Sequence, residues 1–132
     1  MTGISEKKAC VVLIVEDDEA ISDFLSMTLE QEGYEVCVAD DGQKGLDMIR
    51  ARTPVAVLLD LMLPGVDGLT ILKRMQERPE TASIPVAVVS AYADAGDTRK
   101  TLDASPNVKK IFVKPVLTDD LLKNVRKMID GQ

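Results

Sequence analysis

The sequence between residues 54 and 68 reads PVAVLLDLMLPGVDG and decides the fold class. Its apolar run from Val55 to Leu59 is too short to cross a membrane and is typical of a strand buried on both faces. The run ends on a carboxylate, Asp60, and the Pro-Gly and Asp-Gly pairs beyond it predict a tight loop and the start of a helix. We therefore expect Asp60 at the mouth of a sheet, either as a ligand-binding acid or as a cap of the next helix.

The rest of the chain repeats this order of strand and helix. Four more apolar runs predict strands at residues 10–15, 34–39, 86–89 and 108–113. Helical spacing of apolar residues predicts five helices, which end near Gly33, before Pro54, at Arg78, at Asp103 and at about Ile129. The alternation predicts a flavodoxin-like, doubly wound α/β fold with a parallel sheet of strand order 2-1-3-4-5. We expect residues 1–132 to form one domain, with a core from about residue 10 to 129.

Local patterns add expectations about helix faces and ends. Phe24 in the first helix and Leu69 in the third are expected to face the core. The pair Arg78-Pro79 is expected to end the third helix. The helix at residues 94–103 has few apolar anchors and is the weakest of the five. The expected helix caps are Asp18, Glu19, Asp67 and Thr118.

The composition excludes several classes of function. With 16 basic and 22 acidic residues the chain carries a net charge of −6, which argues against nucleic-acid binding and fits a carboxylate cluster that holds a metal. The absence of histidine excludes a histidine-based nucleophile or zinc site. Cys10 and Cys37 each lie in an apolar run and are expected to be buried free thiols. Because the sequence shows no signal peptide, we expect a cytoplasmic protein.

Polar residues stand at the carboxyl ends of four of the predicted strands, which meet at one rim of a parallel sheet. They are Glu16, Asp17, Asp60, Ser90 and Lys114. Crowded carboxylates repel one another, and a hard divalent cation, Mg²⁺ or Mn²⁺, relieves this repulsion. A carboxylate neutralised in this way is able to attack phosphorus and form an aspartyl phosphate. Lys114 and Ser90 would then hold the phosphoryl oxygens.

Four motifs carry a resemblance to a known family. They are LIVEDD (13–18), VLLDLMLPGVDGL (57–69), IPVAVVSA (84–91) and FVKP (112–115). In this order and spacing, from about residue 10 to 129, the chain resembles the receiver domain of response regulators, the phosphoacceptor module of two-component signalling. The resemblance implies a signalling switch rather than an enzyme, which takes a phosphoryl group from a histidine kinase or a phosphotransfer protein in a phosphorelay.

The resemblance also implies a role for each residue of the rim. Asp60 matches the phosphoacceptor, Lys114 the phosphate-binding lysine and Ser90 the hydroxyl that closes on the phosphoryl group. The implied metal ligands are Asp17, Asp60 and the backbone carbonyl of Met62, with Glu16 as the neighbouring acid. The Lys114-Pro115 bond matches a family cis peptide. From the residues alone, Asp17 could instead cap a helix, Ser90 could merely end its strand and Lys114 could be solvated.

The implied output surface comprises the helix at 94–103, the strand at 108–113 and the last helix, and it would bind an unknown target or an attached output domain. Lys109, Lys110 and Lys123 supply charge to this surface or are simply solvated. No direct contact with nucleic acid or membrane is expected.

The chain departs from the family at one position. Many receivers carry an aromatic residue three positions before the lysine, and here the position is Ile111. Phe112 follows, but alternation along a strand would point it to the other face. As a hypothesis, Tyr92 takes over part of the gating. Together with Met62, it would also flank the path of an attacking water and slow hydrolysis of the phosphoryl group.

Three other functions are weighed against this interpretation. A phosphatase of the haloacid-dehalogenase type needs a second acid two residues after the nucleophile, where this chain has Met62. A receiver-like module that is never phosphorylated would normally lack one of the acids or the lysine. A flavodoxin-like cofactor binder would need a phosphate-binding loop and aromatic residues. The kinase, the output, the oligomeric state and whether this is a complete regulator or a fragment stay open.

Overall fold

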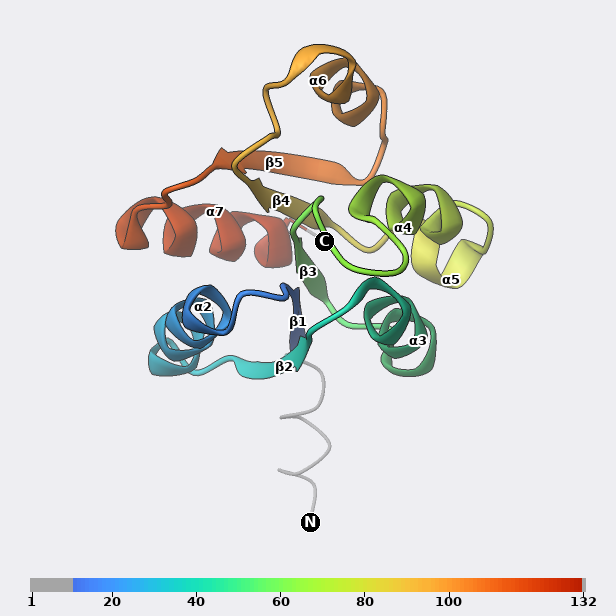
Figure 1. Ribbon diagram of the computed structural model, residues 1–132. Helices are drawn as coiled ribbons and strands as arrows, with labels where there is room; N and C mark the ends of the chain where they lie inside the picture. Colours follow the sequence, from blue (N-terminus) through green and yellow to red (C-terminus); the bar gives the residue numbers. More distant parts are fainter. Residues whose placement is uncertain (1–10, 132) are drawn as a thin grey trace.

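The computed structural model describes residues 11–131, and a five-stranded parallel sheet lies at its centre (Figure 1). The strands are β1 (Val11–Val15), β2 (Glu35–Ala39), β3 (Ala56–Leu59), β4 (Val86–Ser90) and β5 (Val108–Val113). Their order is β2-β1-β3-β4-β5, and every neighbouring pair is parallel. The flavodoxin-like α/β fold predicted from the sequence is therefore confirmed, with the weakly apolar β2 at one edge.

Helices cover both faces of the sheet (Figure 1). On one face lie α2 (Glu19–Gln31) and α7 (Thr118–Asp130). On the other lie α3 (Gly42–Arg52), α4 (Gly68–Met75), α5 (Pro79–Ala82) and α6 (Gly96–Asp103). Right-handed crossovers between parallel strands produce this arrangement of two helical layers.

The core is mainly aliphatic and divides into two clusters, one on each face of the sheet. In β1, Leu13 and Val15 belong to the cluster under α3 and α4, whereas Val12 and Ile14 belong to the cluster under α2 and α7. Successive side chains of a strand point to opposite faces, and both faces are covered. The continuous apolar runs of the sequence follow from this double burial.

The same alternation decides to which face of the sheet each β5 residue before Lys114 points. Ile111 packs against the cluster under α3 and α4, and Phe112 is buried in the cluster under α2 and α7. The prediction that Phe112 points away from Ile111 is confirmed.

Most predicted helix ends agree with the structure. The Asp18 carboxylate accepts the N–H of Ile21 at 3.2 Å and caps α2, and the Asp67 carboxylate accepts the N–H of Thr70 at 2.8 Å and caps α4. The prediction that Thr118 caps the last helix is wrong. Leu117 occupies the cap position without a side-chain bond, and Thr118 is the first helical residue.

Two further expectations are corrected. Pro79 does not simply end the third helix: α4 stops at Met75, and Pro79 begins the extra helix α5, since a proline lacks the N–H that a first helical turn leaves unpaired. The expectation that Leu69 faces the core is confirmed, since it is partly buried against the cluster under α3 and α4, and Ile71 is fully buried beside Leu72 and Met75. Phe24 is 43% exposed, because its position on α2 faces outward beside the buried Leu25.

Cys37 is a free thiol on β2 that is only half-buried, so the expectation of a buried thiol is wrong for it. Its position on an edge strand explains the exposure, and its sulfur accepts a hydrogen bond from the Arg52 guanidinium at 2.8 Å. Cys10 lies outside the described residues. Among residues 11–131 no helix is long and apolar enough to cross a membrane.

Candidate functional site

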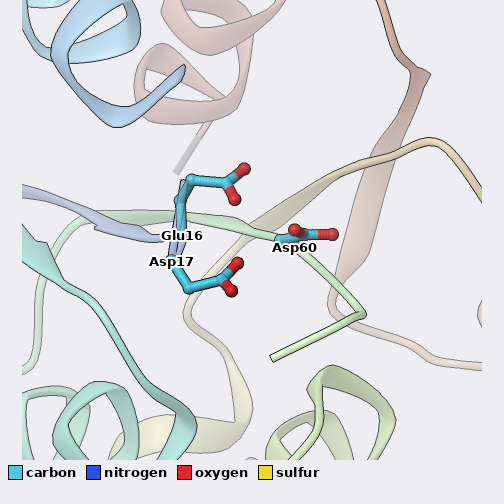
Figure 2. A group of neighbouring side chains, drawn as sticks. All are labelled: Glu16, Asp17 and Asp60. Atoms are coloured by element: carbon cyan, nitrogen blue, oxygen red, sulfur yellow. The ribbon is translucent and has the colours of Figure 1, made fainter. Parts of the chain in front are cut away.

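The carboxyl ends of β1 and β3 bring three acids together. Glu16 and Asp17 follow β1 directly, and Asp60 follows β3, the neighbouring strand. Each acid offers a carboxylate oxygen, and these oxygens lie within 4.8 Å of one another. In Figure 2 the side chains of Glu16 and Asp17 extend to the side on which Asp60 lies, with Glu16 above Asp17. Glu16 and Asp60 are buried, at 2% and 6% exposure, and Asp17 is exposed.

The backbone fixes the two buried acids in place. The ladder extends past the strand ends, because the N–H of Glu16 donates to the Ala39 carbonyl and the N–H of Asp60 donates to the Val15 carbonyl, both at 3.0 Å. The Glu16 carboxylate also accepts the N–H of Asp18 at 3.1 Å. The Asp60 carboxylate accepts the N–H of Met62 at 3.3 Å. By contrast, the Asp17 carboxylate makes no hydrogen bond or ion pair with the described residues and is available to a ligand.

Lys114, just beyond β5, supplies the positive charge of the site. Its ammonium donates to Oε1 of Glu16 at 2.8 Å and to Oδ2 of Asp60 at 3.4 Å. The lysine is therefore paired rather than freely solvated, and it acts as the counter-ion of both buried acids. The Lys114-Pro115 peptide bond is cis, as the resemblance implied.

Burial and neighbouring charges shift the pKa values of Glu16 and Lys114 in definite directions. Burial raises the pKa of Glu16 above its ordinary value; the hydrogen bonds from Lys114 and from the Asp18 N–H oppose the rise, and the nearby Asp60 charge adds to it. For Lys114, burial lowers the pKa, but the hydrogen bond to Glu16 and the charge of Asp60 outweigh this, and the pKa lies above its ordinary value. The lysine stays charged at neutral pH, while the ionisation of Glu16 is disfavoured.

Ser90 is the last residue of β4 and is fully buried. Its hydroxyl accepts the N–H of Tyr92 at 3.2 Å, and its carbonyl accepts the N–H of Lys114 at 3.2 Å. Ser90 thus links the loop that follows β4 to the residue that carries the ammonium. Within residues 11–131, its hydroxyl makes no hydrogen bond to Asp60.

The two residues expected to flank the path of water are both exposed. Met62, two residues after Asp60, is 60% exposed, and Tyr92, two residues after Ser90, is 57% exposed. Each follows the end of one of two neighbouring strands, β3 and β4. Their side chains are free of the core, so changing them should leave the fold intact.

Sequence reasoning missed two residues that support the site, the glycines of the Asp-Gly pairs. A Cβ on Gly68 would lie 2.6 Å from the carbonyl oxygen of Asp60, and a Cβ on Gly42 would lie 1.6 Å from the carbonyl oxygen of Val66. Only a residue without a side chain lets α3 and α4 begin this close to the loop after Asp60. The pairing of a capping aspartate with glycine was the signal available in the sequence.

Comparison with known proteins gives this arrangement a context. The family model described as "Response regulator receiver domain" matches residues 12–126. The chain is 37% identical over 118 residues to the "DNA-binding dual master transcriptional regulator RpaA" of a Synechocystis strain, covering 89% of this chain and 48% of that protein. It is 40% identical over 108 residues to the "Transcriptional regulatory protein CseB" of Streptomyces coelicolor, covering 80% of this chain and 45% of that protein. The chain thus spans about half the length of these relatives.

Solved structures agree with the sequence matches. A CheY-like response regulator receiver domain from Methanospirillum hungatei superposes with a TM-score of 0.80 at 32% identity, covering 92% of this chain and 94% of that one. The fold is also shared with the receiver domain of a sensor histidine kinase from Pseudomonas aeruginosa, with a TM-score of 0.83 at 23% identity. The match covers 92% of this chain and 98% of that one, and that structure has a magnesium ion coordinated in the active site cleft. With the fold, the acidic rim and the family match in agreement, the chain belongs to the receiver domains of two-component response regulators.

Proposed function

We propose that this receiver accepts a phosphoryl group on Asp60, in the presence of Mg²⁺, from a histidine kinase or a histidine phosphotransfer protein. The observation that carries the proposal is the ion-paired cluster at one rim of the sheet. Lys114 bridges the buried carboxylates of Glu16 and Asp60, and Asp17, which has no ion pair with the described residues, lies beside them. A buried cluster of this kind has little structural value by itself, since burying charges costs free energy.

The three carboxylates fit a hard divalent cation. Mg²⁺ prefers oxygen ligands and keeps several waters, so Asp17 and Asp60, with Glu16 beside them and the carbonyl of Met62, would hold it. When bound, the ion neutralises the negative charge of the acids and of the incoming phosphoryl group. The magnesium of the Pseudomonas receiver, at the active site cleft of the same fold, supports this choice of metal. Burial raises the pKa of Glu16, and a nearby cation would favour its ionised form.

The chain's own residues then perform the transfer. An oxygen of Asp60 forms a bond to phosphorus as the bond between phosphorus and the donor's imidazole nitrogen breaks. The leaving nitrogen takes the electron pair of that bond and is protonated. Lys114 turns its ammonium to the phosphoryl oxygens, and the hydroxyl of Ser90 donates to one of them. Proteins catalyse phosphoryl transfer mainly by such positioning and by neutralising charge.

A groove beside Lys114 suits the approach of a donor protein. It has a volume of about 430 Å³, and its walls include Ile21, Phe24, Pro115 and Val116. Phe24 is 43% exposed and Leu117, next along the chain, is 75% exposed. Exposed apolar side chains in a group mark surfaces that bind other proteins. A donor seated there would lie next to the lysine of the site.

Phosphorylation adds about −1.5 to −2 charge to the rim at neutral pH. The bond from the Tyr92 N–H to the Ser90 hydroxyl ties this rim to the loop before α6. Once the Ser90 hydroxyl turns to the phosphoryl group, the loop and the exposed Tyr92 shift, and the surface formed by α6, β5 and α7 changes its affinity for a target. Leu102 is the only buried residue of α6, so this helix is the least firmly held part of that surface.

We further propose that residues 1–132 make up one receiver domain, with an output carried by an attached domain or by a separate protein. The matched relatives, which are about twice as long as this chain, are named as transcriptional regulators.

The test is phosphorylation of the purified chain by acetyl phosphate with Mg²⁺. We expect intact mass to increase by one phosphoryl group, and no increase for Asp60→Asn or after removal of Mg²⁺ with a chelator. Asp17→Asn should lower the extent of labelling while leaving the fold unchanged, because its carboxylate is exposed and pairs with none of residues 11–131. A gain in mass that persists in Asp60→Asn would overturn the assignment of the acceptor. No gain in the wild type would favour a module that acts without phosphorylation.

A further inference from the structure

The loop between β3 and α4 carries the Met62 carbonyl, an implied metal ligand. The backbone of residues 62–66 makes a single hydrogen bond to other backbone groups within residues 11–131. In that bond the N–H of Gly42, the first residue of α3, donates to the carbonyl of Pro64 at 3.2 Å. The segment with the proposed ligand is therefore tied to the rest of the backbone at one point, and that point lies on α3.

The missing side chain of Gly42 brings α3 into direct contact with the same loop. A Cβ at this position would lie 1.6 Å from the carbonyl oxygen of Val66 and 2.5 Å from its carbonyl carbon. Both are backbone atoms, so the rotation of a side chain does not relieve the contact. A residue other than glycine at position 42 therefore requires α3 and the loop to move apart.

The start of α3 is itself held beside the strand that leads to the first acids of the site. A Cβ on Gly45 would lie 2.7 Å from Cγ1 of Val15, the buried last residue of β1. The Asp41 carboxylate caps α3 by accepting a backbone N–H of the first turn at 2.8 Å. Because α3 begins at a defined place beside β1, the bond from Gly42 relates the loop to the acids at the end of that strand.

A simpler account is that Gly42 serves only the packing of the fold. Leu63 and Val66 also anchor the loop, since both are partly buried against the cluster under α3 and α4. Apolar contacts are non-directional, however, and hold the loop on the core without orienting its carbonyl groups. A backbone hydrogen bond has a preferred direction, and the bond to Pro64 lies two residues from Met62. Packing alone therefore does not account for this bond.

We propose that Gly42 is a positioning residue of the cation site, which holds the loop in the conformation in which the Met62 carbonyl binds Mg²⁺ and thereby sets the affinity for the ion. The inference rests on the Mg²⁺ site of the proposed function. Gly42 touches neither the ion nor the phosphoryl group. A group that orients a metal ligand changes metal affinity by about tenfold to a hundredfold when it is altered. Substitution of Gly42 should act on Mg²⁺ binding first, and on phosphorylation only through it.

The wild-type protein provides the first test. If the bond from Gly42 favours Mg²⁺ binding, Mg²⁺ must stabilise that bond by the same factor. Hydrogen exchange of the Gly42 amide, followed by NMR, should slow about tenfold when Mg²⁺ saturates the protein, because local opening becomes rarer. The Thr53 amide, which donates to Ile49 at the other end of α3, is the control and should exchange at an unchanged rate.

Gly42→Ala is the direct test. Calorimetric titration should show Mg²⁺ binding weakened about tenfold or more. The matched control is Gly33→Ala, which adds the same methyl group before β2, toward the amino end of the sheet, where no atom lies within 4 Å. Gly33 has a φ of +92°, so its substitution also costs stability, but it should leave the affinity for Mg²⁺ unchanged.

Labelling by acetyl phosphate separates positioning from catalysis. Gly42→Ala should need about tenfold more Mg²⁺ for half-maximal labelling, and it should reach the wild-type rate once Mg²⁺ is saturating. Mg²⁺ binding and amide exchange are measured without a phosphoryl donor. A wild type that binds the ion but is never labelled would therefore overturn only the proposed phosphorylation, and weaker binding by Gly42→Ala would still support the positioning role.

Four outcomes would overturn the inference. Unchanged Mg²⁺ affinity in folded Gly42→Ala would mean that Gly42 serves only packing. An equal loss of affinity in Gly33→Ala would mean that lower stability alone weakens binding. If Gly42→Ala does not fold, amide exchange in the wild type decides, and a Gly42 rate unaffected by Mg²⁺ would reject the coupling. A wild type that binds no Mg²⁺ would overturn both this inference and the proposed function.

Discussion

The carboxyl and amino ends of the same sheet both gather charged side chains, but they hold them in opposite ways. At the carboxyl end, Glu16 and Asp60 are buried, and Lys114 pairs with both of them. At the amino end, Lys109 and Lys127 are exposed and have no carboxylate partner among the described residues. The comparison teaches that burial, rather than charge alone, makes a group costly to change. An internal partner is needed only where water is excluded.

The largest effect is expected from breaking the buried ion pairs. Lys114→Ala removes the counter-ion of Glu16 and Asp60. It should lower the free energy of unfolding of the metal-free protein by about 3 kcal/mol. This is the lower end of the range for breaking a buried pair, because the lysine side chain is 20% exposed. Urea unfolding measures the change, and added Mg²⁺ should restore part of it. Lys123→Ala, at an exposed lysine, is the control and should change little. Equal losses in both variants would contradict the distinction between the two ends.

Removing a buried negative charge should have the opposite sign. Burial disfavours the ionised form of Glu16, so Glu16→Gln should raise the free energy of unfolding of the metal-free protein, on the order of 1 kcal/mol, the usual size of a single-substitution effect. The same variant should bind Mg²⁺ more weakly, as measured by calorimetric titration. A less stable Glu16→Gln protein would show that the pair with Lys114 outweighs the cost of burial.

The advantage of Glu16→Gln should depend on pH. Because the pKa of Glu16 is higher in the folded chain than in the unfolded one, the folded protein binds the proton more tightly. The wild type therefore gains stability at this site as pH falls toward 4.5, the ordinary pKa of a glutamate. The difference between variant and wild type should therefore shrink from pH 7 toward that value. Paired denaturant curves at several pH values measure it. A difference that grows on acidification would contradict the direction of the shift.

A smaller effect is expected from two exposed residues at the carboxyl end. If Asp60 is phosphorylated as proposed, Met62→Asn/Tyr92→Ala should open the path of water and speed loss of the phosphoryl group severalfold. The increase should stay below tenfold, which corresponds to about 1.4 kcal/mol in the activation free energy. The decay of labelled protein after removal of the donor gives the rate. Leu117→Ala, an exposed apolar residue, serves as the control. An unchanged rate would reject the steric account.

The smallest effect is expected at the amino end. Lys109→Glu should alter the free energy of unfolding by no more than about 0.5 kcal/mol, because its ammonium is exposed and meets only the carbonyl of Pro106. Thermal and urea unfolding measure the change. A loss comparable to that of Lys114→Ala would mean that Lys109 is needed for the fold.

The sequence by itself determined the fold class, because the apolar runs and the residues that end them are local signals. The five runs predicted the strands to within one residue at their described ends, and Asp18 and Asp67 were identified as caps from their neighbours alone. The polar residues at the strand ends were predicted to share a rim, since all strands of a parallel sheet end on one side. The family match then confirmed the class of protein.

Only the tertiary structure decided which of these groups touch. The pairing of Lys114 with Glu16 joins residues 98 positions apart, and no local pattern encodes such a contact. The close approach at Gly42 and Gly68, the outward direction of Phe24 and the bulge at Lys109 also depend on how the elements pack. Packing is a property of several distant segments at once, so a single segment cannot specify it. Periodicity shows which residues face inward, and the fold decides what they meet.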